Sequence, residues 1–424
     1  MPQKAKKPTI EEIVGLARAA AAEAANYQER FAAEDTEARK IVDIMERFLR
    51  VKSRVVYGGA AINAHLPPDK KFYDPRLYLP DYDFMTPDPL QDCAHLIVAF
   101  HKEGFSEVEA KFGIHEGTYK VFVNFRAAAD ITYMPPDIYE RIMKDSRSID
   151  GIHYASVNFL RMNMYLELSR PAGMVSRWEK VYQRLLLLNE EYPIRAGNCA
   201  DEPLRKLANE EPDTTGTIVN RIIDAGIEAG AVFLSGAAYL VAPHSFPNND
   251  EVVMLISDKA AALVETLEKA LHLKAIPHDA MGELLPATTE LRTTKKRLVA
   301  VVFETMACHS YTTLNSPKGY RLGSIDLLIQ MYYAMYFAEL NGYLPVRLLC
   351  LIQNLIEIES ERRAAEAARP KGRRRSVFSL ECIGHQPTMP ELKKAHRARI
   401  QEKKKELVKA LRFKESFRVS RKRK

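Results

Sequence analysis

The alternation of apolar and polar positions over residues 54–86 predicts a strand, a glycine turn, a helix and a second strand. The chain there begins with the β-branched run RVVYGG, continues as AAINAHL, and reaches YDFMT, whose alternation is typical of a half-buried strand. An amphipathic helix is expected over about residues 87–101, and the segments TYKVFVNF and ADITYM predict further strands. Strands and helices therefore share one domain, of the α+β class.

The same order of patterns returns in the second half of the chain. AVFLSGAAYLV corresponds to RVVYGGAAINA, and EVVMLISD with its following helix corresponds to DYDFMTPD, at offsets of 177 and 170 residues. This order predicts a duplicated domain. In the alignment Glu251, Val253 and Cys308 stand where the first copy has Asp81, Asp83 and Asp130, so the second copy lacks the acids. The alternative is a chance likeness between two generic β-turn-α units.

These patterns divide the chain, whose 424 residues suggest two or three domains. We expect a helical N-terminal segment over 1–50, a first domain over 51–195 and a helical connector over 196–230. A second, altered copy of the first domain is expected over 231–368, followed by a basic tail over 369–424.

Composition narrows the class of protein. Hydrophobic residues make up 46% and charged residues 28%, which is ordinary for a globular protein. The chain has no apolar run of the roughly 18 residues that would span a membrane. Its start carries basic residues without an apolar core and cleavage site. We therefore expect neither a membrane partner nor secretion.

The cysteines predict neither a zinc ribbon nor a disulfide framework. All five are scattered and no two form a CxxC pair. A reducing compartment is the expected location.

Charge is divided unevenly along the chain. Residues 369–424 hold 20 Lys/Arg against 5 Asp/Glu, whereas residues 1–368 hold 42 against 50. Such a tail indicates a polyanionic partner, and a very basic helix is expected from Pro390 onward. The alternative is a solvated face or a disordered tail. The candidate RNA contacts are Lys403, Lys404, Lys405, Arg421, Lys422 and Arg423.

Three aspartates are the strongest chemical signal. Asp81 and Asp83 stand two residues apart on a predicted strand, so both carboxylates face the same side. Two like charges held close together favour a cation, and hard carboxylate oxygens suit Mg²⁺ or Mn²⁺. Asp130 lies in an otherwise apolar strand, where a carboxylate needs a metal or a cationic partner. An acidic pair can also simply end a strand that faces water.

The glycine turn precedes these acids. Gly58 and Gly59 let a phosphate group approach the backbone, and the free amides of the following helix start favour anions. Asn63 is a further candidate for nucleotide binding, one helical turn later. The alternative for Asn63 is a helix residue that faces solvent.

The ordered set of two glycines, an acidic pair about 22 residues later and a single Asp about 50 residues beyond it resembles the polymerase-β-type nucleotidyltransferases. The segments GGAAIN, LPDYDF, ADITYM and MYLELSRPAGMVSRWEKVYQRLLLLNEEYP resemble the poly(A) polymerase catalytic subunits of large cytoplasmic DNA viruses of the poxvirus, asfarvirus and mimivirus type. The resemblance implies a polymerase-β-like nucleotidyltransferase domain followed by a second, degenerate one. The superfamily's usual glycine-serine is Gly58-Gly59 here, which removes a hydroxyl contact to phosphate.

The resemblance also implies an activity, which is the addition of AMP from ATP to RNA 3′ ends with two Mg²⁺ or Mn²⁺ ions. Asp81 and Asp83 would hold both ions, and Asp130 the ion beside the RNA hydroxyl. Asn158 and Arg161 are candidates for contacts to the nucleotide, with ordinary surface polar residues as the alternative. The resemblance implies a host-cytoplasmic site of viral replication, or packaging in the virion.

Two other functions fit parts of the sequence. A uridylyl- or CCA-adding nucleotidyltransferase would keep all three acids, whereas a non-catalytic RNA-binding scaffold would use the basic tail. The sequence leaves open whether a second copy of the chain or a separate processivity subunit is a partner.

Overall fold

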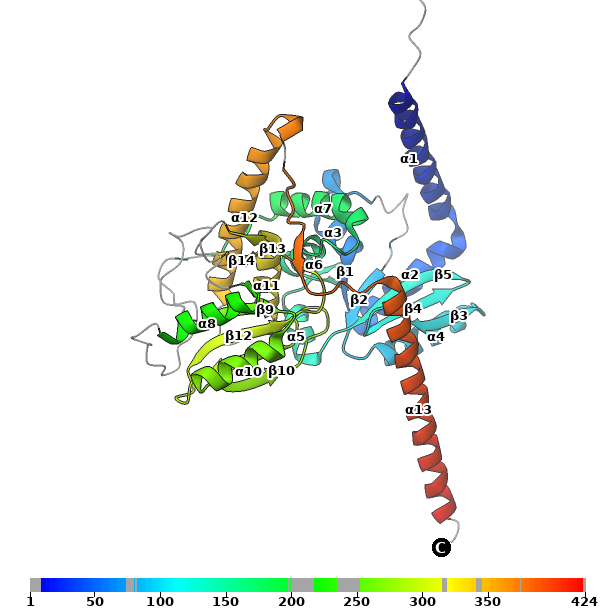
Figure 1. Ribbon diagram of the computed structural model, residues 1–424. Helices are drawn as coiled ribbons and strands as arrows, with labels where there is room; N and C mark the ends of the chain where they lie inside the picture. Colours follow the sequence, from blue (N-terminus) through cyan, green and yellow to red (C-terminus); the bar gives the residue numbers. More distant parts are fainter. Residues whose placement is uncertain are drawn as a thin grey trace, which may run out of the picture. The chain divides into compact units, whose positions relative to one another are not determined.

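The protein is described here by a computed structural model (Figure 1). The structure describes residues 9–73, 80, 82–196, 199, 217–234, 252–314, 319–340, 345–373 and 375–421. The chain forms two compact units. The first contains residues 1–112, 119–133 and 143–155, and the second contains 113–118, 134–142 and 156–424. Residues 156–195, which the sequence analysis grouped with the first domain, thus lie with the second unit.

The first unit is a mixed sheet with helices. Its seven strands follow the order β3-β4-β5-β2-β1-β7-β6. Its central strands β2 and β5 are parallel, while β1 runs antiparallel to β2 and parallel to β7. The strands are β1 (Val55–Tyr57), β2 (Tyr82–Thr86), β3 (Val108–Phe112), β4 (Thr118–Val123), β5 (Arg126–Tyr133), β6 (Arg147–Ile149) and β7 (Ile152–Tyr154).

The helices of the first unit are α1 (Ile10–Glu34), α2 (Thr36–Lys52), α3 (Gly58–His65) and α4 (Pro89–Lys102), with a short 3-10 turn at Pro68–Lys70. The predicted N-terminal helix is broken at Asp35, whose side chain accepts hydrogen bonds from the amides of Glu37 and Ala38 and so starts α2.

Helix α2 covers one face of the sheet. On that face the Tyr82 hydroxyl donates to Glu46 at 2.8 Å, and the Phe84 ring centroid lies 5.8 Å from that of Phe48. Alternate residues of a strand point to opposite faces. Asp83, between Tyr82 and Phe84, is therefore directed to the face opposite α2.

The second unit contains an eight-stranded sheet with the order β10-β11-β12-β9-β8-β14-β13-β15. Apart from β15, this order repeats that of the first sheet strand for strand. The directions repeat as well, because β9 is parallel to β12, and β8 is antiparallel to β9 and parallel to β14. The strands are β8 (Val232–Phe233), β9 (Val253–Ser257), β10 (Lys274–His278), β11 (Thr288–Arg292), β12 (Leu298–Glu304), β13 (His309–Thr313), β14 (Arg321–Gly323) and β15 (Glu381–Ile383).

The register of the two sheets gives the counterparts of the acids. In the first sheet Val56 pairs with Phe84, and in the second sheet its counterpart Phe233 pairs with Leu255. Leu255 therefore corresponds to Phe84, and Met254, one residue earlier, corresponds to Asp83. Met254 pairs with Val301, the counterpart of Asp130. Both are buried apolar residues, with 2% and 0% of their surface exposed.

The sequence alignment of the copies is therefore wrong in detail at these positions. Val253 is one residue away from the position of Asp83, and Cys308 lies beyond the end of β12. Glu251 falls outside the described residues. The alignment predicted that the second copy lacks the acids. This is correct at the positions that match Asp83 and Asp130, where Met254 and Val301 stand.

The helices of the second unit are α5 (Pro136–Lys144, of which residues 136–142 belong to this unit), α6 (Val157–Leu168), α7 (Trp178–Glu191), α8 (Thr217–Glu228), α10 (Ala260–Leu271), α11 (Ile325–Ala338), α12 (Pro345–Ala367) and α13 (Met389–Arg421), with 3-10 turns at Val175–Arg177 and Lys371–Arg373. Among the described helices, none is long and apolar enough to cross a membrane.

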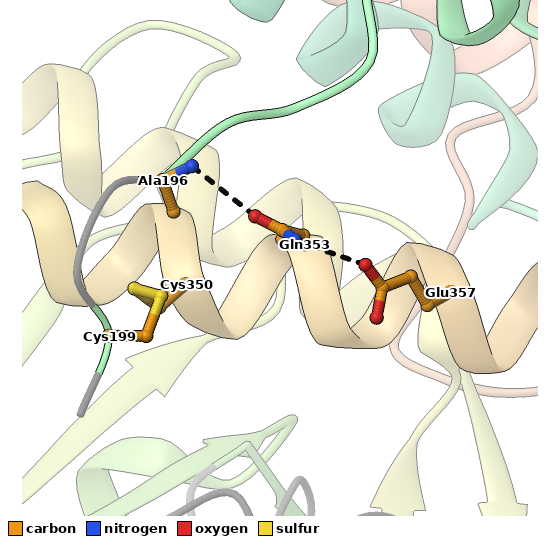
Figure 2. The surroundings of a disulfide bond; sticks show 5 residues. All are labelled: Ala196, Cys199, Cys350, Gln353 and Glu357. Atoms are coloured by element: carbon orange, nitrogen blue, oxygen red, sulfur yellow. Dashed lines mark hydrogen bonds between the residues drawn. A yellow bond between two sulfur atoms is a disulfide. The ribbon is translucent and has the colours of Figure 1, made fainter.

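Two disulfides connect distant segments of the second unit. Cys199 is bonded to Cys350 on α12, beside the Ala196 amide that donates to Gln353 at 3.3 Å (Figure 2). Cys308 is bonded to Cys382 on β15. The expectation that the cysteines form no disulfides is wrong for these four. Their separations of 151 and 74 residues leave no local spacing signal, because only the fold brings the partners together.

A buried charged cluster joins α6, α11 and α12. Arg363 donates to Asp326 and lies 2.7 Å from Glu359, and the Tyr165 hydroxyl donates to Glu359 at 2.8 Å. Two carboxylates thus share one guanidinium in the core. Burial, reinforced by the charge of Asp326, raises the pKa of Glu359 well above its usual range.

The raised pKa of Glu359 gives stability a defined pH dependence. The folded protein holds the Glu359 proton more tightly than the unfolded chain does. The contribution of this proton to the free energy of unfolding is therefore complete below the unfolded pKa near 4.5, and it is lost as pH rises through the folded pKa. We expect Glu359→Gln, which cannot titrate, to flatten the fall in unfolding free energy above pH 4.5. Urea denaturation at several pH values measures this. Glu357→Gln, an exposed acid on the same helix, is the control, and parallel curves for wild type and Glu359→Gln would contradict the assignment.

Candidate functional site

The structure brings Asp83 and Asp130 together on neighbouring parallel strands. Asp83 on β2 and Asp130 on β5 are direct partners in the register of the first sheet, and both are half-buried. Residues paired across adjacent strands point to the same face. Two acids far apart in sequence therefore present their carboxylates side by side, on the face opposite α2.

Gly58 forms one wall of this acidic pair. It begins α3 directly after β1, with φ +71°. A Cβ atom on Gly58 would lie 2.5 Å from Oδ2 of Asp83, closer than any side chain allows. The absence of a side chain therefore lets the Asp83 carboxylate rest against the backbone at the start of α3.

Lys120 on β4 provides the cationic partner of Asp130. Its ammonium group contacts Oδ2 of Asp130, and 40% of the Lys120 side chain remains exposed. Thr132, on the same face of β5, lies 2.8 Å from the hydroxyl of Tyr57. The acids are thus bordered by a glycine on one side and a lysine on the other.

The described residues supply two of the three predicted ligands for a divalent cation. Asp83 and Asp130 offer hard carboxylate oxygens on one face, the ligand type that Mg²⁺ and Mn²⁺ prefer. Asp81, the third predicted ligand, lies outside the described residues. Among the described residues alone, no group of three His, Cys, Asp or Glu side chains could hold a metal. The close approach that Gly58 permits supports a ligand site at this pair.

Gly59 and Asn63 belong to the same helix, α3. Asn63 is buried and uses its side chain on the following loop, accepting from the amides of Phe72 and Tyr73 and donating to the Tyr73 carbonyl. These bonds fix the backbone of Phe72 and Tyr73 against α3. They give Asn63 a supporting role in the first unit.

Asn158 and Arg161 lie in the second unit, on α6. Arg161 is only 2% exposed and donates to Asn158, Asn189 and the carbonyls of Leu188 and Tyr192. Its guanidinium therefore ties α6 to the end of α7. The alternative of an ordinary surface residue is therefore wrong for Arg161, because its side chain is buried. A contact of Asn158 and Arg161 with the nucleotide stays a prediction.

The predicted basic helix is present as α13. It starts with a capping box, since the amide of Thr388 donates to Glu391 at 2.7 Å. Hydrogen bonding to Thr388 and His385 lowers the pKa of Glu391 to about 2. Lys403, Lys404 and Lys405 are exposed on this helix. Nothing is described of the Arg421 side chain, and Lys422 and Arg423 lie outside the described residues.

Sequence reasoning overlooked Lys120. Lys120 alternates with buried residues in the strand TYKVFV, which places it on the polar face of β4. That alternation was a usable signal. Its contact with Asp130 depends on which strands pair, and the sequence does not show this.

The chain is similar in sequence to known proteins over part of its length. Residues 43–174 match the family model described as "Poly(A) polymerase catalytic subunit". A protein of Acanthamoeba polyphaga mimivirus that carries this name provisionally is 33% identical over 190 residues, which cover 44% of this chain and 31% of the relative. A protein of African swine fever virus (isolate Tick/Malawi/Lil 20-1/1983) with the same provisional name is 27% identical over 159 residues, covering 36% and 33%. The matched part thus spans about a third of these relatives.

The fold has a counterpart among solved structures. The crystal structure of the Megavirus polyadenylate synthase matches with a TM-score of 0.77 and 22% identity, covering 96% of this chain and 86% of that one. The mixed α/β architecture with two sheets is therefore similar to that of this solved structure. Together these findings confirm the resemblance that the sequence motifs predicted.

Proposed function

We propose that the chain is an enzyme that adds AMP from ATP to RNA 3′ ends, as a polynucleotide adenylyltransferase. The observation that carries the proposal is the Asp83–Asp130 pair packed against Gly58, within the segment that matches the poly(A) polymerase model. Under this proposal the first sheet and its helices form a polymerase-β-like nucleotidyltransferase domain. The second is a degenerate copy, in which Met254 and Val301 replace the acids.

The residues of the site have separate tasks in this reaction. Asp81, Asp83 and Asp130 would hold two Mg²⁺ or Mn²⁺ ions, which when bound stabilise the entering and leaving oxygens of an in-line displacement. The backbone at Gly58 and Gly59 would take the triphosphate, because a helix start offers free amides to anions. No covalent intermediate with a side chain is needed. Catalysis then consists of positioning and charge stabilisation.

A primer-extension assay with each nucleotide tests the proposal. The protein, an RNA primer and Mn²⁺ or Mg²⁺ are incubated separately with ATP, UTP, CTP and GTP. We expect ATP alone to give long homopolymer tracts. Preference for UTP, or addition of CCA, would indicate another nucleotidyltransferase, and failure of all four would favour a scaffold.

The basic helix α13 is proposed to bind the RNA backbone without reading its sequence. Ending the chain at Thr388 should weaken RNA binding equally for all primer sequences and flatten the dependence of affinity on salt, by about 0.7 in log–log slope per lost phosphate contact. Addition of a single AMP at saturating primer should continue. Salt titrations of RNA binding by fluorescence anisotropy measure the slope.

A substitution in the intact helix serves as the matched variant. Changing Lys403, Lys404 and Lys405 together to Gln keeps α13 and should lower the slope by up to about 2. A slope equal to that of the wild type in both variants would show that the helix does not contact RNA.

We further propose that a second copy of the chain or a separate processivity subunit supports the synthesis of long tracts. The proposed location is the host cytoplasm or the virion.

A further inference from the structure

The row of paired residues that contains the two acids continues into two lysines. Across the first sheet Tyr57 pairs with Asp83, Asp83 with Asp130, and Lys120 with Lys111, while Lys120 contacts Asp130. The strands concerned are neighbours in the order β1, β2, β5, β4, β3. We call Lys111 and Lys120 the lysine pair. It lies on the side of the acids away from Gly58.

Both lysines present their ammonium groups on the face that carries the acids. Lys120 contacts Asp130 there, and direct cross-strand partners such as Lys111 and Lys120 share a face. Their side chains are 59% and 40% exposed. Phe122 lies two residues beyond Lys120, and its ring centroid is 5.2 Å from the Lys111 ammonium.

Fold stability gives little reason for this arrangement. Like charges directly opposite each other destabilise a pair of strands. Lys111 has Glu109 as a partner, but both side chains are exposed, and exposed ion pairs contribute little. Lys120 gives one of its three donors to Asp130 and keeps others for a ligand. Two adjacent, accessible ammonium groups are suited to an anion with more than one charge.

We propose that the lysine pair binds the phosphate backbone of the RNA primer next to its 3′ end. This inference rests on the proposed adenylyl transfer. In an in-line displacement the entering hydroxyl and the leaving pyrophosphate lie on opposite sides of the phosphorus. If the triphosphate occupies the Gly58 side of Asp83, the primer must approach from the Asp130 side. The lysine pair begins one strand beyond Asp130, about 5 Å away at ordinary strand spacing.

The experiment measures primer binding without catalysis. A fluorescein-labelled oligo(A) RNA is titrated with protein in EDTA at several salt concentrations, and binding is followed by anisotropy. Lys111→Met and Lys120→Met should each weaken binding several-fold at low salt and flatten the salt slope by about 0.7. Lys111→Arg should keep the wild-type slope because the charge remains. Lys102→Met, at an exposed position at the end of α4, makes the same charge change and should have no effect.

A second variant tests the direction of the effect. Glu109→Gln removes the carboxylate beside Lys111 and should raise RNA affinity, whereas a purely structural lysine pair would not respond in this way. The inference is overturned if either lysine variant keeps the wild-type slope, if Lys102→Met reduces the slope as much, or if Glu109→Gln does not raise affinity.

Failure of this inference can be told apart from failure of the proposed function. Unchanged slopes in a chain that still adds AMP would overturn the lysine pair alone. A wild-type chain that binds RNA but adds no nucleotide would overturn the proposed activity, whatever the slopes are.

Discussion

Asp83→Asn is expected to abolish AMP addition while leaving the fold intact. The amide is a poor ligand for a hard cation, and losing several kcal/mol of charge stabilisation corresponds to a fall of about a thousandfold or more in rate. Asparagine has the shape of aspartate, so it still fits against Gly58. Removing one of two neighbouring like charges should not lower stability. The measurement is single-turnover addition of labelled AMP together with thermal unfolding.

Two further observations make this result specific. Asp43→Asn removes an equal charge from the exposed side of α2 and should leave the rate unchanged. Mn²⁺ binding, followed by electron paramagnetic resonance, should weaken in Asp83→Asn and not in Asp43→Asn. Joint loss of activity and of thermal stability in Asp83→Asn would instead indicate a structural role for the carboxylate.

Gly58→Ala is expected to lower activity by about a hundredfold through displacement of Asp83. The new Cβ would lie 2.5 Å from Oδ2 of that carboxylate, and a displacement of about 1 Å at a reacting centre can cost this factor. The φ of +71° adds a backbone cost of about 1–2 kcal/mol for a residue with a side chain. The rate of AMP addition and the free energy of unfolding are measured together.

Gly104 separates the two contributions. It also has a positive φ, at +94°, but a Cβ there would meet nothing within 4 Å. Gly104→Ala should therefore lose similar stability and keep its activity. If both variants lose activity in proportion to stability, the contact between Gly58 and Asp83 has no part in the reaction.

The strands that carry Asp83 and Asp130 were predictable because each acid is a charged residue among apolar residues. Asp83 alternates with apolar residues in YDFMT, and Asp130 is a lone charge in an apolar run, so each could be placed on a strand. That these two strands pair in parallel, with the aspartates in register, depends on contacts between residues 47 positions apart in the chain. The contact of Lys120 with Asp130 was missed for the same reason.

The second sheet shows why the copy could be recognised but not aligned. Residues 253–257 are all buried, so the strand has no alternation to fix its register. An error of one residue therefore went unseen at Val253. Asp130 of β5 has no polar counterpart in β12, whose side chains are apolar until Glu304. Because nothing in β12 marked the matching position, the alignment placed it beyond the strand, at Cys308.

The measurement that tests the central claim most directly is transfer of label from α-³²P-ATP to the 3′ end of an RNA primer, by the wild type, Asp83→Asn and Asp43→Asn in parallel. The account predicts labelled, lengthened RNA with the wild type and Asp43→Asn, and none above background with a folded Asp83→Asn. Extension by Asp83→Asn at the wild-type rate would contradict the claim that the Asp83–Asp130 pair is the site of AMP addition.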